Sequence, residues 1–178
     1  MSSINEDVKV IDNYLPKELF DQFSDLTSSD EFTWGYDANA VDDGDNFPQL
    51  VHVFFCADSY QPSSPWYDDL IDILDFCNVN AVGRIKLNGN FKESTIRPKP
   101  FHRDFHYDDP KDKKSNLNIM ILHLNTNDGF TIIKDTDDEI YRIKSVANRA
   151  IFFPNSYEHT GTSCTDISLR KVFNMVYA

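Results

Sequence analysis

The sequence predicts a mainly β protein of the α+β class, in which two helices pack on one side of a β-sandwich or barrel. Two observations support this prediction. Clear helical patterns of apolar residues occur only before residue 79 of the 178-residue chain. From Val79 onward, short strand patterns follow one another, separated by loops rich in Asp, Asn, Gly and Lys. The length suits a single domain.

The first segment predicts a short strand followed by a helix. Val8 and Val10 alternate as in a strand. Leu15-Pro16 then indicates a helix start, because proline has no N–H and the first helical turn leaves that group unbonded anyway. The apolar residues that follow at helical spacing are Leu19, Phe20, Phe23 and Leu26. We therefore expect one buried helix face.

A second helix is expected after an acidic loop. Residues 37–48 (DANAVDDGDNFP) are rich in turn-forming residues and predict a surface loop, which is followed by a strand at 50–55. Ser63-Ser64-Pro65 predicts the start of the helix, with Ser64 as the N-cap. Its apolar stripe consists of Trp66, Leu70, Ile73, Leu74 and Cys77.

The remainder is expected to be strands and loops. The predicted strands are 79–88, 117–124, 130–133, 139–146, 149–153 and 170–177. His123 shares a strand face with Ile119 and Ile121, so we expect it at a cavity wall or in the core. The long charged loop 105–116 (FHYDDPKDKKSN) would carry function at a barrel mouth, although a simple solvated loop is equally consistent.

Composition excludes several classes of protein. The 17 Lys and Arg residues against 29 Asp and Glu give a net charge of −12, which disfavours nucleic-acid and anionic-membrane partners. No apolar run approaches the roughly 20 residues of a membrane helix, and the N-terminus does not resemble a signal peptide. The three cysteines are widely spaced and form no CxxC pair. We expect a soluble protein of a reducing cytoplasm.

The histidines suggest a metal site. The five are His52, His102, His106, His123 and His159. His102 and Asp104 form one H-x-D pattern, and His106 and Asp108 form another; in an extended segment such pairs share a face. His159 follows a strand and a turn and is the candidate third ligand. Two histidines and one carboxylate leave open positions on Fe(II), as in non-haem oxygenases. A zinc hydrolase, or a surface histidine beside a loop acid, is the alternative.

Arg170 strengthens the metal hypothesis. It follows His159 by eleven positions, and a neighbouring antiparallel strand could place its guanidinium behind the metal. Arginine holds a carboxylate through two hydrogen bonds and stays charged when buried. A strand-end surface cation is the alternative. Arg84, Lys86 and Asn88 alternate on one strand face, where they could contact a ligand or face solvent at a sheet edge.

Several stretches together resemble a known superfamily. They are FHRD, the strand ending LNTNDGFT, the segment SVANRAIFFPNSYEHTGTSCTD and the pattern R-x-x-x-N-x-x-Y. They resemble the Fe(II)- and 2-oxoglutarate-dependent oxygenases, and most of all the small prolyl-4-hydroxylase-like members found in bacteriophage and marine viral genomes. The resemblance covers residues 79–178 strongly and the N-terminal VIDNYLPKELFDQF moderately.

This resemblance implies a double-stranded β-helix, a jelly-roll barrel of the cupin type, with two N-terminal helices buttressing one sheet. A single domain would span 1–178, with helical support and first strands in 1–78 and the catalytic barrel core in 79–178. The residues that match the iron ligands are His102, Asp104 and His159. Arg170 matches the residue that pairs with the distal carboxylate of 2-oxoglutarate, and Asn88 is a weaker match for a co-substrate contact. His106 and Asp108 stay open as alternative ligands, because the insertion after Asp104 is longer than the family pattern.

The implied activity is hydroxylation of a C–H bond with Fe(II), 2-oxoglutarate and O₂, releasing succinate and CO₂. A peptidyl substrate, prolyl above all, is the first expectation, and a small molecule is also consistent. A nucleic-acid-modifying dioxygenase is disfavoured by the negative charge and by the absence of a second arginine near Arg170. A non-catalytic jelly-roll binding module of a phage is the competing class. The expected location is the cytoplasm, that of the host cell for a viral protein. The sequence indicates neither the oligomeric state nor whether 37–48 and 105–116 act as lids.

Overall fold

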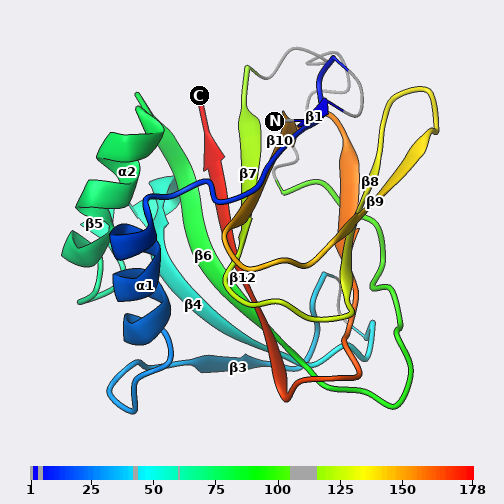
Figure 1. The fold of residues 1–178 in the computed structure, drawn as a ribbon, viewed down its shortest axis with the longest axis horizontal. Helices are drawn as coiled ribbons and strands as arrows, with labels where there is room; N and C mark the ends of the chain where they lie inside the picture. Colours follow the sequence, from blue (N-terminus) through cyan, green and yellow to red (C-terminus); the bar gives the residue numbers. More distant parts are fainter. Residues whose placement is uncertain (1, 4–5, 42–43, 60, 105–115) are drawn as a thin grey trace.

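Two antiparallel sheets face each other in this computed structural model, and two helices cover the outer side of the larger sheet (Figure 1). The structure describes residues 2–3, 6–41, 44–59, 61–104 and 116–178. The smaller sheet has the order β11 (Glu158–Gly161), β8 (Phe130–Lys134) and β9 (Ile140–Lys144). The larger sheet runs β1 (Ser2–Ser3), β2 (Lys9–Ile11), β10 (Arg149–Pro154), β7 (Asn118–His123), β12 (Leu169–Tyr177), β6 (Val82–Phe91), β4 (Gln49–Cys56) and β3 (Gly35–Asp37), with β5 (Gln61–Pro62) beside β4. The mainly β barrel with two supporting helices confirms the predicted fold class.

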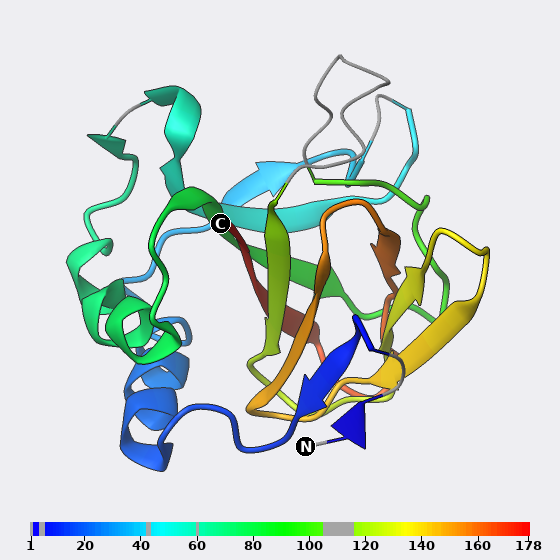
Figure 2. The same ribbon diagram turned by 90° about the horizontal axis from the view of Figure 1, so that it is seen from above.

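The helices α1 (Lys17–Leu26) and α2 (Ile71–Cys77) lie together on one side of the barrel, as the view from above shows (Figure 2). Their apolar faces pack against the outward side chains of the larger sheet. Phe23 of α1, for example, meets Phe173 of β12 edge to face, with ring centroids 5.5 Å apart. Burial of this kind provides most of the stability of a short amphipathic helix.

A second apolar cluster fills part of the space between the two sheets. Its buried members include Val10, Ile119, Ile121, Ile133, Ile143, Ile151, Phe153 and Val176. They come from β2, β7, β10, β12 and the smaller sheet. The inward positions of β6 are polar instead, and strand register places Lys86 beside Asn174 of β12. The barrel interior therefore has an apolar half and a polar half.

The structure supports the first predicted helix start and corrects the second. Pro16 directly precedes α1, as expected. The second helix does not begin at Ser64: a 3-10 turn, η2 (Asp68–Leu70), leads into α2 at Ile71. Ser64 Oγ accepts the Trp66 backbone N–H at 3.0 Å, so the capping motif closes an isolated turn upstream. Another 3-10 turn, η1 (Ala57–Ser59), follows β4. In the described part of the chain, no helix has the length and apolar character needed to cross a bilayer.

Candidate metal centre

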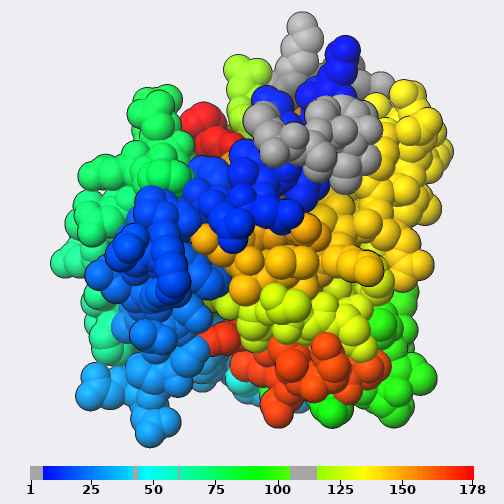
Figure 3. All heavy atoms as spheres, viewed as in Figure 1, coloured from blue at the N-terminus to red at the C-terminus, as the bar shows by residue number. Residues whose placement is uncertain are grey.

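An extended segment after β6 carries two of the candidate ligands to the smaller sheet. Lys92 N–H bonds Ser168 C=O at 3.0 Å, so this segment starts beside the loop that precedes β12; the two lie together along the lower edge of Figure 3. Further on, Lys99 N–H donates to Gly161 C=O at 3.1 Å. His102 and His159 exchange both backbone hydrogen bonds, at 3.0 and 2.9 Å. This pairing places the H-x-D pattern against β11.

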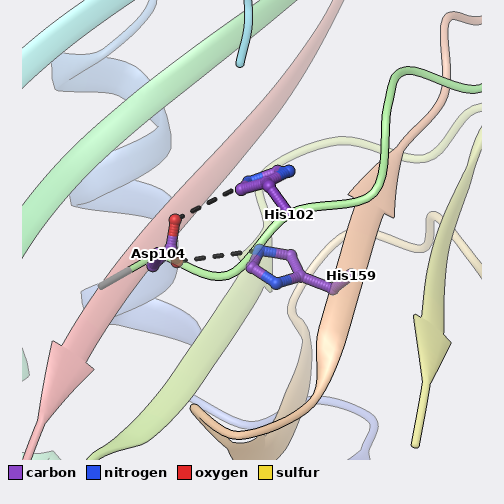
Figure 4. A group of neighbouring side chains, drawn as sticks. All are labelled: His102, Asp104 and His159. Atoms are coloured by element: carbon purple, nitrogen blue, oxygen red, sulfur yellow. Dashed lines mark ion pairs between the residues drawn. The ribbon is translucent and has the colours of Figure 1, made fainter. Parts of the chain in front are cut away.

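The side chains of His102, Asp104 and His159 converge (Figure 4). His102 Nε2 lies 3.7 Å from Asp104 Oδ1, and His159 Nε2 lies 3.6 Å from Asp104 Oδ2. One ligand atom from each residue lies within 4.8 Å of the others. Separations of this size allow all three to approach a single ion at about 2 Å. The side chains of Asp104 and His159 are 1% and 5% exposed, so the convergence occurs inside the protein.

The three groups are in the protonation states that bind metal. Burial lowers the pKa of His159 to about 3, although the nearby Asp104 partly opposes this shift, and burial also lowers the pKa of His102. For Asp104, burial acts to raise the pKa, but the surrounding His159, Lys86 and Arg84 outweigh it and hold the pKa well below its usual range. Both imidazoles are therefore neutral at neutral pH and the carboxylate is ionised, as metal ligation requires.

Two side chains of the larger sheet hold Asp104 in place. Arg84 Nη2 on β6 donates to Oδ1 at 2.5 Å, and Asn174 Nδ2 on β12 donates to Oδ2 at 2.8 Å. Outer contacts of this kind orient a ligating carboxylate and tune the metal. The donor set, its spacing and its supporting contacts fit a divalent metal ion with open coordination positions.

Arg170 lies deep in the same cavity and is 1% exposed. Its guanidinium donates to neutral acceptors: Nε to Ser145 Oγ at 2.9 Å, and Nη2 to Thr131 Oγ1 at 3.0 Å and Phe130 C=O at 3.2 Å. Burial lowers its pKa to about 10, so it stays charged at neutral pH. Among the described residues no carboxylate forms an ion pair with it. A buried guanidinium without a counter-ion is costly to the fold and suits an anionic ligand.

The expected strand relationship between His159 and Arg170 is wrong. They do not occupy neighbouring antiparallel strands: β11 pairs with β8, whereas β12 pairs with β6 and β7. The loop between them crosses from one sheet to the other, so the two side chains line the same cavity from opposite sheets. Gly161 permits this approach, because a β-carbon there would lie only 3.2 Å from Arg170 Nη1.

The centre opens into a cavity that is continuous with solvent. Its wall includes Asn88, and β6 is flanked by β4 and β12, so Asn88 does not lie at a sheet edge. Ala40 and Val41 place part of the predicted 37–48 loop at the cavity. Lys86, which was expected on the same strand face as Asn88, also lines it. Four further residues of the wall had no role in the sequence analysis: Gln49, Lys99, Thr131 and Asn174. Of these, Asn174 falls in the R-x-x-x-N pattern, which could have pointed to it.

Of the other candidates, two fall outside the described residues and two make contacts in other parts of the structure. His106 and Asp108 are outside the described residues, as is most of loop 105–116. His123 is fully buried at the end of β7, with Nε2 3.4 Å from Thr131 Oγ1. His52 bonds Thr33 C=O and Ser64 Oγ at 2.6 and 2.7 Å, close to Phe32 and Phe54. These two histidines therefore have structural contacts and do not join the His102 cluster.

Comparison with solved structures identifies the fold. No protein-family model matches the sequence. No curated protein matches it either. An oxidoreductase of the 2OG-Fe(II) oxygenase family from Burkholderia pseudomallei superposes with a TM-score of 0.72 at 10% identity, covering 97% of this chain and 85% of that one. A prolyl-4-hydroxylase from Pseudomonas putida gives 0.57 at 10% identity, with 96% and 92% covered.

A third solved structure is a prolyl hydroxylase from Trichoplax adhaerens in complex with a peptide fragment of the hypoxia inducible factor oxygen degradation domain. It gives a TM-score of 0.62 at 11% identity, covering 97% of this chain and 84% of that chain. All three matches extend over nearly the whole of this chain. The chain therefore has the double-stranded β-helix fold of the 2-oxoglutarate- and iron(II)-dependent oxygenases.

Proposed function

We propose that this protein is an Fe(II)- and 2-oxoglutarate-dependent dioxygenase that hydroxylates a C–H bond. One observation carries the proposal: His102 and His159 of the His-Asp-His cluster line the same cavity as Arg170, a buried arginine without a carboxylate partner among the described residues. His102, Asp104 and His159 would hold the iron. Arg170 would bind the distal carboxylate of 2-oxoglutarate through its planar fork.

Bound iron, with 2-oxoglutarate and O₂, supplies the oxidising chemistry, and the co-substrate leaves as succinate and CO₂. The protein residues position the reacting groups. Arg84 and Asn174 keep the Asp104 carboxylate aimed at the metal position. Phe153 packs on the His159 ring with centroids 5.2 Å apart, and Ile121 and Val172 add apolar wall. These contacts limit water around the reacting centre.

Asn88 is proposed as a polar contact to the co-substrate. It lies opposite Val172, one inward position from Asn90, which is itself opposite Arg170. Its side-chain oxygen is buried, and within the described part of the chain it has no hydrogen-bond partner. An unpartnered buried amide is costly unless a ligand satisfies it.

A peptidyl substrate, prolyl in the first instance, is supported by the prolyl hydroxylase neighbour that was solved with a bound peptide. Such a substrate would lie across the open end of the cavity. Ala40 and Val41 stand at the cavity and would be among the residues close to it.

Succinate release tests the proposal. Purified protein with Fe(II), 2-oxoglutarate and O₂ should form succinate, and Asp104→Ala should abolish this turnover because the proposed metal site loses its carboxylate ligand. Asp137→Ala is the matched control, since Asp137 is exposed in the turn before β9. Circular dichroism would verify that both variants fold. Full succinate formation by Asp104→Ala would refute the assignment, and no succinate from the folded parent protein would favour a binding module.

A further inference from the structure

The cavity wall has the opposite charge from the rest of the chain. The protein carries a net charge of −12, yet the described residues that line the cavity include three cations, Lys86, Lys99 and Arg170, and no Asp or Glu. Asp104 lies close by, but it already bonds Arg84. In a chain this acidic, an acid-free cationic wall points to an anionic ligand, because clefts lined by one sign of charge concentrate the field.

The two lysines reach the cavity from different sides. Lys86 is an inward residue of β6, between Val53 of β4 and Asn174 of β12. Lys99 belongs to the segment docked on β11, and its Nζ donates to Gln49 Oε1 on β4 at 2.8 Å. Neither lysine forms an ion pair with any carboxylate that the structure describes. Gln49 thus holds Lys99 in place without neutralising it.

Burial and nearby cations disfavour the charged forms of Lys86 and Lys99. Burial, and then the proximity of Arg170 and Lys86, lowers the pKa of Lys99 to about 7. Burial and the nearby Arg84 lower the pKa of Lys86 to about 8. An anion bound between the two ammonium groups would relieve this repulsion, so its binding is favoured by more than a surface contact would be.

The co-substrate alone does not supply enough negative charge. On the proposed function, one carboxylate of 2-oxoglutarate goes to the metal and the other to Arg170. Asp104 and the first carboxylate then face both the metal and Arg84. Among the described residues no carboxylate pairs with Lys86 or Lys99, and Asp37, Asp45 and Asp104 act on the two lysines only at longer range.

We propose that Lys86 and Lys99 receive a carboxylate of the substrate, so that the substrate is an acid. This inference rests on the proposed function and narrows its substrate class. The carboxylate belongs either to a small free acid or to an Asp or Glu side chain of a peptide. Asn90 Oδ1, buried and unpartnered among the described residues, stands in the same wall to accept an N–H or O–H of that molecule.

A direct test uses acetate and its neutral analogue acetamide. The Zn(II)-loaded protein is first saturated with 2-oxoglutarate, and occupancy is followed by the backbone amide NMR signal of Arg170. Acetate should then shift the Lys99 and Gly161 amide signals saturably, and acetamide should not. Lys99→Met should weaken acetate binding by about tenfold or more, as for a hydrogen bond to a charged group. Lys144→Met, an exposed change on β9, should leave it unchanged.

The outcomes separate the two proposals. If 2-oxoglutarate gives no saturable shift at Arg170, the proposed function fails. If 2-oxoglutarate does bind, three results would each refute only the substrate inference. These results are equal behaviour of acetate and acetamide, displacement of 2-oxoglutarate by acetate, and acetate binding by Lys99→Met that equals that of the parent.

A second experiment distinguishes the sources of the carboxylate. Succinate release is measured with amino acids and their amides, and with peptides that carry Asp or Glu and their Asn or Gln counterparts. Stimulation by the acid of a pair and not by its amide supports the inference, and the kind of pair identifies the source. Lys86→Met should remove that stimulation. Equal stimulation by both members of the pairs, or by neutral prolyl peptides, would overturn it.

Discussion

The two faces of β6 and β12 differ sharply in composition although both faces are covered by protein. The outward side chains Ile85, Leu87, Phe173 and Met175 are all fully buried against the helical side. The inward side chains of β6 are all polar (Arg84, Lys86, Asn88 and Asn90), and those of β12 are Arg170 and Asn174 together with Val172 and Val176. An antiparallel strand with one wet face also alternates in this way, but there the polar residues face bulk water. Here they face a cavity between two sheets.

This difference separates the residues that stabilise the fold from those proposed to bind ligands. Apolar burial on the outer face stabilises the sheet. On the inner face, the side-chain oxygens of Asn88, Asn90 and Asn174 are buried and lack partners among the described residues, which costs about 1–3 kcal/mol for each such group. Buried polar groups that lower the stability of the ligand-free protein are expected where a ligand provides their hydrogen-bond partners. The inner face is therefore where we place the chemistry.

The largest effect on stability is expected on the outer face. Leu87→Ala removes a fully buried side chain and should lower the free energy of unfolding by about 2–5 kcal/mol, through lost transfer energy and the cavity left behind. Urea denaturation measures this change. Metal affinity per folded molecule should stay at the parent value. A cost below about 1 kcal/mol would mean that this face does not build the core as described.

Arg170→Met should have the opposite effect to Leu87→Ala, with ligand affinity lost and stability kept. Removing an unpaired buried charge removes its desolvation cost, which offsets the loss of the hydrogen bonds to Ser145 and Thr131, so the stability of the ligand-free protein should not fall as it does for Leu87→Ala. Affinity for 2-oxoglutarate should fall about 100-fold or more, because a bidentate charge-assisted contact is lost. Titration with the co-substrate and urea denaturation on the same sample measure both quantities. Unchanged co-substrate affinity would remove Arg170 from the site.

Acid should destabilise the protein through His52. Its Nδ1–H donates to Thr33 C=O, so Nε2 accepts from the Ser64 hydroxyl, and burial lowers its pKa. Below the unfolded-state pKa of about 6.5, the unfolded chain therefore binds a proton that the folded chain does not. Stability is complete above that pH and falls as pH drops, by up to about 1.4 kcal/mol per pH unit for this group. Urea denaturation from pH 7 to 5 should show a shallower slope for His52→Gln, and an equal slope would contradict the assignment.

The smallest effect is expected beside Leu87 on the opposite face. Asn88→Ala should not lower the stability of the ligand-free protein, because it removes a buried amide oxygen that has no partner among the described residues. It should weaken 2-oxoglutarate binding by about tenfold or less, the loss of one neutral hydrogen bond. Titration of Asn88→Ala and Leu87→Ala with 2-oxoglutarate compares the inner and outer faces of β6 directly. If Asn88→Ala binds 2-oxoglutarate as tightly as the parent does, Asn88 lines the cavity but does not contact the co-substrate.

Local patterns in the sequence predicted much of the fold. The apolar stripe after Pro16 and the alternation in β6 each depend on neighbours within a few positions, so periodicity reveals them. Ser64 shows the limit of such reasoning, because a capping residue serves a turn as well as a helix. The pairing of β11 with β8 could not be predicted either, because the local sequence around His159 does not specify which sheet this strand joins.

The site was predicted in part for the same reason. The H-x-D pattern and His159 were candidates because their residue types and spacing suit a metal, and the fold brings them together. Lys99 has no such signal: it gains its place from Gln49, fifty positions away, and from the docking of its segment on β11. The net charge of −12 is a sum over the whole chain, so it does not reveal the local positive charge of the cavity wall. Long-range contacts of this kind come from the tertiary fold and from no local pattern.

The central claim is that His102, Asp104 and His159 share one Fe(II) beside a bound 2-oxoglutarate. The most direct measurement is the absorption spectrum of the anaerobic protein with Fe(II) and 2-oxoglutarate. The account predicts a weak visible charge-transfer band that saturates at one iron per chain and is absent from His159→Ala. A folded parent protein with no such band, or a His159→Ala variant that retains it, would contradict the account.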